Sequence, residues 1–338
     1  MKLTRRHTLG LIGATTAMGL ATPNIAMNKK IKVGALRFTS HSGSFIAKER
    51  EYFADNGLDV ELVFFQASQP MAVAIASKDI DYAVTAITGG LANLAEKGAI
   101  KIIGGALKEE AGLQGMKYLV SDVAFQNGVK APKDLDGMRY GITQTGSSLH
   151  YQGSKMAAAE NISLSYVPLQ KVGTLVGAIT SGQIDAFSIV PHIALPIAGG
   201  GNAHIIGNIS DYIPDYQITV VFTSTHNAEF ERLLTSSFLN AFTTGVDDYA
   251  AAMIDQSEGQ EGIDDMVDII HKYVYTDRER AKAAPSIING TMRLSKGAAL
   301  NLASVRDQLE WFQSEGLVDP GVTLNMLVDD SYVEIIDA

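Results

Sequence analysis

A strand, helix, strand pattern occurs twice along the chain in one register, and no other feature of the sequence limits the fold as strongly. Residues 58–63 (LDVELV) align with residues 162–167 (ISLSYV) as strand patterns. The same offset pairs Gln66 with Gln170, Ser77 with Ser181, Ile80 with Ile184, and Asp81 with Asp185. A register that holds over several elements indicates an internal duplication. We therefore expect two lobes of similar topology, with Asp81 and Asp185 in one shared structural role at a helix-to-strand turn.

The alternation of strand and helix patterns predicts an α/β fold, each lobe being a mostly parallel sheet flanked by helices. Strands are expected over 31–36, 58–64 and 80–84 in the first unit, and over 140–143, 164–167 and 184–189 in the second. Amphipathic helices over 228–246, 263–273 and 298–312 should pack back on the first lobe. Apolar stretches at 119–120 and 220–222 suit crossings between lobes. We expect lobe 1 to span 28–119 plus 225–338, and lobe 2 to span 120–224.

Residues 1–26 have the order of a signal peptide, with a basic start, a short apolar stretch and small residues before a cleavage site. Arg5 and Arg6 in TRRHTLGLIG resemble a twin-arginine signal. The apolar run of about 12 residues is too short for a membrane anchor, since a spanning helix needs about 20. The sequence therefore predicts export to the periplasm as a soluble protein, without a lipid anchor because the chain has no Cys.

Charge and residue types exclude several classes of function. The 338-residue chain has a formal net charge of −10 and no cluster of Lys and Arg after residue 30, so we expect no nucleic-acid binding. The lack of Cys excludes disulfides, thiolate metal sites and a cysteine nucleophile. The seven His are not paired at metal-binding spacing, and no nucleophile elbow or phosphate loop occurs. We expect a binding protein, not an enzyme, with no catalytic residue, metal site or cofactor.

Several segments resemble one family of exported proteins. They are the opening IKVGALRFTSHSGSFIAKEREYFADNGLDVEL, the turns ASKDIDYAVT and TSGQIDAFSI, the segment LDGMRYGITQTGSSLHY and the ending LEWFQSEGLVDPGVTL. In this order they are similar to periplasmic solute-binding proteins of the nitrate, sulfonate and taurine type, grouped with thiamine-pyrimidine binders. The resemblance implies a type II-like, two-lobed periplasmic binding protein fold, with a ligand cleft between the lobes. It also implies a monomer that delivers its ligand to the transmembrane subunits of an ABC importer.

The ligand is expected where strands end and helices begin, because ligands of open parallel sheets bind beyond the carboxyl ends of the strands. Small polar residues stand there in both lobes: His41, Ser42, Gly43 and Ser44 in the first, and Gly146, Ser147 and Ser148 in the second. Hydroxyls, approachable backbone and helix N-termini favour an anion. The other interpretation is that each Ser only caps its helix. Further ligand-binding candidates are Thr85, Thr88, Tyr151 and His192.

These features predict a binding protein that closes about a hinge on a small organic anion. The expected ligand is a sulfonate, such as taurine or an alkane or aromatic sulfonate, or a carboxylate. One alternative is binding of a pyrimidine precursor, or a pyrimidine-synthesis-type enzyme on the same fold. The resemblance implies a cysteine-rich motif in that branch, and the absence of Cys counts against it. A sensor domain is a third possibility, although no attached DNA-binding or signalling segment is recognisable.

Overall fold

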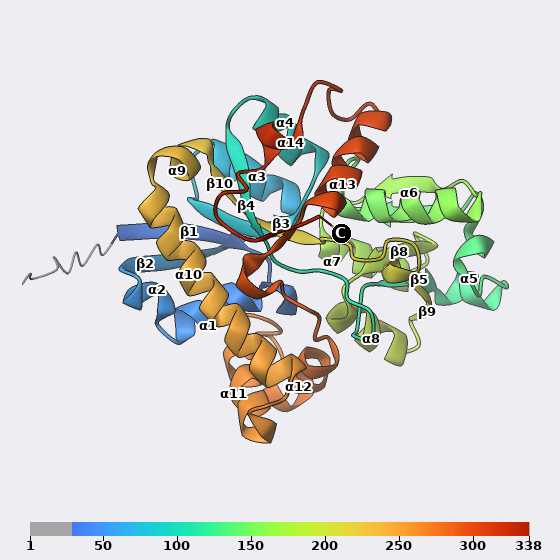
Figure 1. Cartoon of the computed structure of the whole chain (residues 1–338). Coiled ribbons are helices and arrows are strands. Elements are labelled where there is room, and N and C mark those ends of the chain that lie inside the picture. The colour runs from blue at the N-terminus through green and yellow to red at the C-terminus, as the bar shows by residue number, and fades with distance from the viewer. Residues whose placement is uncertain (1–28, 338) are drawn as a thin grey trace, which may run out of the picture.

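A computed structural model describes residues 29–337 of the protein, and two five-stranded sheets organise it (Figure 1). The signal peptide expected over 1–26 lies outside the described residues. The first sheet has the order β2-β1-β3-β10-β4, and the second has the order β7-β6-β8-β5-β9. Within residues 29–337, no helix has the length and apolarity needed to cross a membrane.

The two sheets have the same strand directions at corresponding places. The strands of the first are β1 (Lys29–Ala35), β2 (Leu58–Phe64), β3 (Tyr82–Ala86), β4 (Ile100–Gly105) and β10 (Thr219–Ser224). Those of the second are β5 (Lys117–Ser121), β6 (Arg139–Ile142), β7 (Ser165–Pro168), β8 (Ala186–Ile189) and β9 (Ala203–Asn208). One strand of each sheet, β10 and β5, runs antiparallel to both neighbours. The remaining pairs are parallel, so the expected mostly parallel α/β lobes are confirmed.

Helices cover both faces of each sheet, and we call the part of the molecule built on the first sheet lobe 1 and that on the second lobe 2. Lobe 1 contains α1 (Ser42–Glu49), α2 (Tyr52–Asp55), α3 (Ser68–Ala76), α4 (Gly89–Glu96), α9 (Thr225–Phe230), α10 (Arg232–Tyr249), α11 (Gly259–His271), α12 (Arg280–Asn289), α13 (Leu302–Ser314) and α14 (Leu324–Leu327). Lobe 2 contains α5 (Asp122–Gln126), α6 (Ser148–Glu160), α7 (Val172–Thr180) and α8 (Pro191–Gly199). Short helical turns are η1 (Thr39–His41), η2 (Pro132–Leu135), η3 (Ile209–Asp211), η4 (Ala250–Ile254) and η5 (Lys296–Ala298), and a small two-stranded sheet pairs β11 (Leu300–Asn301) with β12 (Ile335–Ile336).

Residues at corresponding positions of the two lobes form corresponding contacts. The Asp81 carboxylate accepts a hydrogen bond from the Lys32 amide at 2.8 Å, and the Asp185 carboxylate accepts one from the Arg139 amide at 2.9 Å. Each therefore ties the start of β3 or β8 to the neighbouring strand, which confirms the shared structural role. A Cβ on Gly34 would lie 2.6 Å from Ile80 Cδ1, and one on Gly141 would lie 2.4 Å from Ile184 Cδ1. In both lobes the end of an isoleucine side chain fills the space above the glycine and would have to shift to admit a larger residue.

The chain changes sheet through two neighbouring segments, 106–116 and 209–218. The Ile218 amide donates to the Leu107 carbonyl at 2.9 Å, and the Glu109 amide donates to the Tyr216 carbonyl at 2.9 Å, so the crossings run side by side. A third segment joins them, because the Ser295 amide donates to the Ala106 carbonyl. If each strand is assigned to the lobe of its sheet, lobe 2 contains all of β5 and none of β10. By this criterion lobe 2 begins and ends earlier in the chain than the expected boundaries at 119/120 and 224/225.

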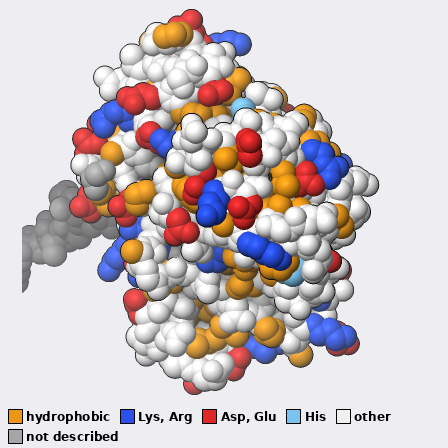
Figure 2. All heavy atoms as spheres, turned by 90° about the vertical axis from the view of Figure 1, so that its right-hand side faces the viewer, with side chains coloured by type: hydrophobic (Ala, Val, Ile, Leu, Met, Phe, Trp, Pro, Cys, Tyr) orange, Lys and Arg blue, Asp and Glu red, His pale blue; other side chains and the backbone are white. Residues whose placement is uncertain are grey.

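The tail packs on lobe 1, as expected, with α10 against α1 and α14 against β4. The helix predicted over 228–246 is two helices, since the chain leaves helical geometry at Glu231 between α9 and α10. The helix predicted over 298–312 begins at Leu302, where the Asn301 side chain caps it by accepting from the Ser304 amide at 3.0 Å. On the lobe 2 side of the molecule, seen in Figure 2, acidic and basic side chains are interspersed.

A buried carboxyl in the first crossing predicts a pH-dependent stability. The Glu109 side chain is 2% exposed, and burial raises its pKa from 4.5 to about 7. The Met116 amide donates a hydrogen bond to the Glu109 carboxylate, which lowers the pKa but only partly offsets the effect of burial. Because the pKa is higher in the folded state, ionisation of Glu109 destabilises that state as pH rises from 4.5 through 7. We expect Glu109→Gln to gain up to about 3 kcal/mol of unfolding free energy relative to the parent between pH 5 and pH 8. Denaturant titrations at both pH values measure this difference, and a difference independent of pH would contradict it.

Candidate functional site

A cavity of about 60 Å³ lies between the two lobes, and we call it the inner cavity. Its walls come from the carboxyl ends of β1, β2, β3, β6 and β8 and from the crossings. The polar lining residues are Ser40, His41, Ser68, Thr85, Thr143, Ser148 and Thr219. The apolar lining residues are Leu36, Phe38, Ala67, Ala86, Leu107, Met116, Leu149, Val172, Ile189, Val190 and Ile218. Both lobes thus contribute hydroxyls to the same space.

Two helices begin at the inner cavity, one from each lobe. Ser68 is the first residue of α3, and its hydroxyl lies 2.9 Å from that of Thr85. Ser148 is the first residue of α6. The first amides of a helix have no partner within the helix. No side chain caps α3 at Ala67, while the cap of α6, Ser147, accepts only from the His150 amide. The cavity therefore borders backbone N–H groups that are free to donate hydrogen bonds. It also borders the positive ends of two helix dipoles, which favour an anion.

His41 contributes a neutral imidazole to the inner cavity. The side chain is 1% exposed, and burial lowers its pKa to about 3. Its Nδ1 accepts from the Leu36 amide at 3.4 Å, which leaves the proton on Nε2. No Lys or Arg is found among the described residues that line this cavity. An anion there would be held by hydroxyls, amides and an imidazole N–H, without a cationic side chain.

Of the residues predicted from the sequence, His41, Thr85 and Ser148 line the inner cavity. Ser42, Gly43 and Ser44 lie in the first turn of α1 and do not line it. The Ser42 hydroxyl donates to the Thr39 carbonyl at 2.6 Å, and Gly43 packs against Phe242 of α10.

Ser147 and Thr88 are helix caps. The Ser147 hydroxyl accepts from the His150 amide at 3.3 Å, and the Thr88 hydroxyl accepts from the Leu91 amide at 3.1 Å. For Ser147 this contact agrees with the interpretation as a cap that the sequence left open, whereas for Thr88 the sequence predicted only a ligand contact. Neither residue is among those that line the inner cavity.

Gly146, Tyr151 and His192 lie where the lobes touch each other. The Gly89 amide of lobe 1 donates to the Gly146 carbonyl at 2.9 Å. The Tyr151 hydroxyl donates to Asp307 of α13, and Lys155 pairs with the same carboxylate at 2.9 Å. His192 Nδ1 lies 3.0 Å from Thr39 Oγ1. The lobes are therefore closed on one another on both sides of the inner cavity.

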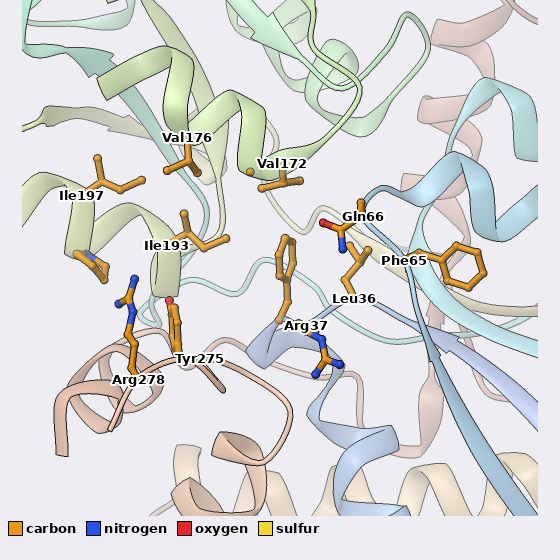
Figure 3. A pocket seen from close by; sticks show the side chains of 13 residues that line it. Leu36, Arg37, Phe65, Gln66, Val172, Val176, Ile193, Ile197, Tyr275 and Arg278 are labelled. Carbon is orange, nitrogen blue, oxygen red and sulfur yellow. The ribbon is translucent and has the colours of Figure 1, made fainter. Parts of the chain in front are cut away.

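A larger pocket of about 320 Å³ opens beside the inner cavity, and we call it the outer pocket (Figure 3). Leu36, Phe38 and Val172 line both spaces, so the two adjoin. The other lining residues of the outer pocket are Arg37, Phe65, Gln66, Gly173, Val176, Ile193, Pro196, Ile197, Tyr275 and Arg278.

Sequence reasoning did not select several lining residues. Ser68 starts the helix that follows the predicted strand 58–64, so the rule that selected Ser148 would have found it. Thr143 ends a predicted strand and was accessible to the same rule. Met116 ends the first crossing and Thr219 begins β10, and no local pattern marks them as cavity residues.

Comparison with known proteins identifies the family. The family model described as NMT1/THI5 like matches residues 38–253. No curated protein sequence matches the chain. The alkanesulfonate-binding protein SsuA from Xanthomonas axonopodis pv. citri, bound to MOPS, has a TM-score of 0.70 at 14% identity, over 89% of this chain and 98% of that one.

Two further structures share the fold. The periplasmic nitrate-binding protein NrtA from Synechocystis PCC 6803 has a TM-score of 0.65 at 13% identity, covering 86% of this chain and 83% of that one. The desulfurization enzyme DSZB has a TM-score of 0.60 at 14% identity, covering 90% and 97%. The resemblance found in the sequence is confirmed, and the matched residues span well over half of the chain. The protein therefore belongs to the NMT1/THI5 like family and has the two-lobed fold of periplasmic binding proteins.

Proposed function

We propose that the protein is the substrate-binding component of an ABC importer, exported to the periplasm, where the soluble monomer closes on a small organic anion. The observation that carries this proposal is the inner cavity, a space between the lobes to which both bring hydroxyls and helix N-termini. A molecule in this space contacts both lobes at once. It therefore binds the closed form more tightly than the open form and shifts the population toward closure.

The donors around the cavity support an anion as the ligand. A sulfonate or carboxylate accepts several hydrogen bonds, and the first turns of α3 and α6 together with Ser68, Thr85 and Ser148 offer such donors. The apolar wall of Leu107, Ile189 and Ile218 suits the carbon part of the molecule. The related fold of an alkanesulfonate-binding protein supports a sulfonate, such as taurine or an alkane or aromatic sulfonate.

A ligand panel tests this function directly. We expect at least one sulfonate or carboxylate to raise the melting temperature of the protein, since ligand at about 100 times its dissociation constant adds about 2.7 kcal/mol of stability. Calorimetry then gives the affinity, and small-angle scattering compares the compactness of free and bound protein. If neutral pyrimidines bind and no sulfonate or carboxylate does, the assignment of an anion is wrong.

Adjacent serines separate ligand contact from helix capping. We expect Ser148→Ala to weaken anion binding by roughly 5- to 100-fold, with little change in stability, because its hydroxyl faces the inner cavity. We expect Ser147→Ala to lower the unfolding free energy by about 1 kcal/mol, because its hydroxyl caps α6. Calorimetry and denaturant titration of both variants measure the two effects. Unchanged affinity in Ser148→Ala would remove that residue from the ligand site.

A second candidate function is an enzyme acting on a pyrimidine or related ring, because the desulfurization enzyme DSZB shares the fold. Of the described residues lining the inner cavity, only His41 has a titratable side chain, and burial keeps it neutral. A general acid or base would have to be this imidazole. Incubation of each bound compound with the protein, followed by chromatography, distinguishes the two functions, since turnover favours the enzyme and unaltered ligand favours the binding protein.

A further inference from the structure

The outer pocket has one apolar side that comes from lobe 2. Val172 and Val176 of α7 and Ile193 and Ile197 of α8 present partly exposed side chains to it. Figure 3 shows Val172 and Val176 across the pocket from Arg37, Tyr275 and Arg278. An apolar chain or ring leaving the inner cavity past Val172 would be covered by these side chains, which favours its burial.

The opposite side carries two arginines without an acidic partner. The described part of the chain contains eight arginines, and six of them form ion pairs with Asp or Glu: Arg50, Arg139, Arg232, Arg280, Arg293 and Arg306. Within residues 29–337, the two that form no such pair, Arg37 and Arg278, both line the outer pocket. In a protein with a net charge of −10, an unpaired guanidinium group that faces a pocket indicates a place for a negative group.

Both arginines are oriented by aromatic rings. The Arg37 guanidinium lies 3.9 Å from the centre of the Phe64 ring and donates to the Tyr273 carbonyl at 3.0 Å. The Arg278 guanidinium lies 4.6 Å from the centre of the Tyr275 ring. Phe64 and Tyr273 do not line the outer pocket, so the Arg37 guanidinium is directed away from it, whereas Tyr275 does line it. Stacking on Tyr275 limits the motion of the Arg278 guanidinium without neutralising its charge, and most of its five N–H donors stay available.

We propose that the outer pocket is a second subsite for the same ligand, taking an apolar spacer against α7 and α8 and a second anionic group beside Arg278. This inference rests on the proposed function, because the first anionic group occupies the inner cavity. The preferred ligands are then elongated organic dianions, such as an aliphatic dicarboxylate or an aromatic ring with a sulfonate at one end and a carboxylate at the other.

Matched probes that differ in one charged group test the subsite. Calorimetry compares octanoate with octanedioate, and benzenesulfonate with 4-sulfobenzoate, on the parent protein and on Arg37→Gln, Arg278→Gln and Arg280→Gln. Arg280→Gln is the matched control, since it removes the same charge nearby from an arginine that pairs with Asp264 and Asp268. We expect the dianion of at least one pair to bind about tenfold more tightly than its monoanion.

We expect Arg278→Gln to remove most of this gain while leaving monoanion affinity unchanged, and Arg37→Gln and Arg280→Gln to change neither. Equal affinity for both members of every pair, with monoanions bound, would overturn the subsite and leave the proposed function standing. Equal weakening of monoanion and dianion by Arg278→Gln would also overturn it, because this arginine would then act only through the overall field. If no probe binds, both the subsite and the proposed anion function fail.

Discussion

Gly290→Ala is expected to weaken ligand binding by about 10- to 100-fold without a comparable loss of stability. Gly290 ends α12 of lobe 1, and it faces the start of α8 in lobe 2. A Cβ on this residue would lie 2.3 Å from His192 Cβ, 2.5 Å from its Cα and 2.7 Å from its amide nitrogen. Backbone atoms cannot rotate away, so the added methyl group forces the lobes apart and lowers the population of the closed form.

The stability of the lobes themselves should change little, because the backbone of Gly290 (φ −91°, ψ 10°) is accessible to alanine. Calorimetry with any anion that binds the parent measures the affinity, and small-angle scattering measures the opening. Gly199→Ala is the control, since a Cβ at that position on α8 would meet no atom within 4 Å. If Gly290→Ala binds as tightly as the parent, closure of α8 on α12 is not required for binding.

Gly245→Val is expected to destabilise the protein by about 3 kcal/mol through the packing of α10 on α1. A Cβ on Gly245 would lie 2.5 Å from the Gly43 carbonyl oxygen and 2.9 Å from the Ala47 amide nitrogen. On the facing helix, a Cβ on Gly43 would lie 2.8 Å from both Phe242 and Val246. The two glycines allow the helices to cross at close range, and a larger side chain must separate them.

Thermal and denaturant unfolding measure this effect, for which Gly177→Val is the control. Gly177 is also a helical glycine, but a Cβ there would meet no atom within 4 Å. We expect the control to change stability by less than about 1 kcal/mol, since Gly and Val differ little in helix propensity. A similar loss in both variants would show that the close approach of α1 and α10 is not the cause.

Much of the fold followed from local patterns. The predicted strand over 58–64 coincides with β2, because alternation is a property of the segment by itself. Asp81 and Asp185 were assigned a shared role from their register alone, and their carboxylates accept equivalent amides. The helix α8 was harder to find, because it contains Pro191 and Pro196 and follows a strand directly.

Only part of the candidate site could be predicted from such local patterns. The sequence brings Ser42, Gly43 and Ser44 to the start of a helix beside a strand end, but it does not say which face of that helix turns inward. In the structure Gly43 faces α10, whose residues lie far along the chain, while His41 and Ser40 line the inner cavity. The direction in which a helical side chain points relative to the cavity depends on which element packs against the helix. The residue type alone does not determine that element.

The sequence by itself determined the duplicated α/β units, the order of their strands and helices, and the strand ends that border the inner cavity. Only the tertiary structure decided which hydroxyls line the inner cavity, that Met116 of the first crossing and Thr219 of β10 join them, and that Arg37 and Arg278 remain unpaired at the outer pocket. The physical reason is the separation along the chain over which each effect acts. Periodicity and capping act between residues a few positions apart, whereas a cavity between lobes is formed by surfaces that long-range packing alone brings together.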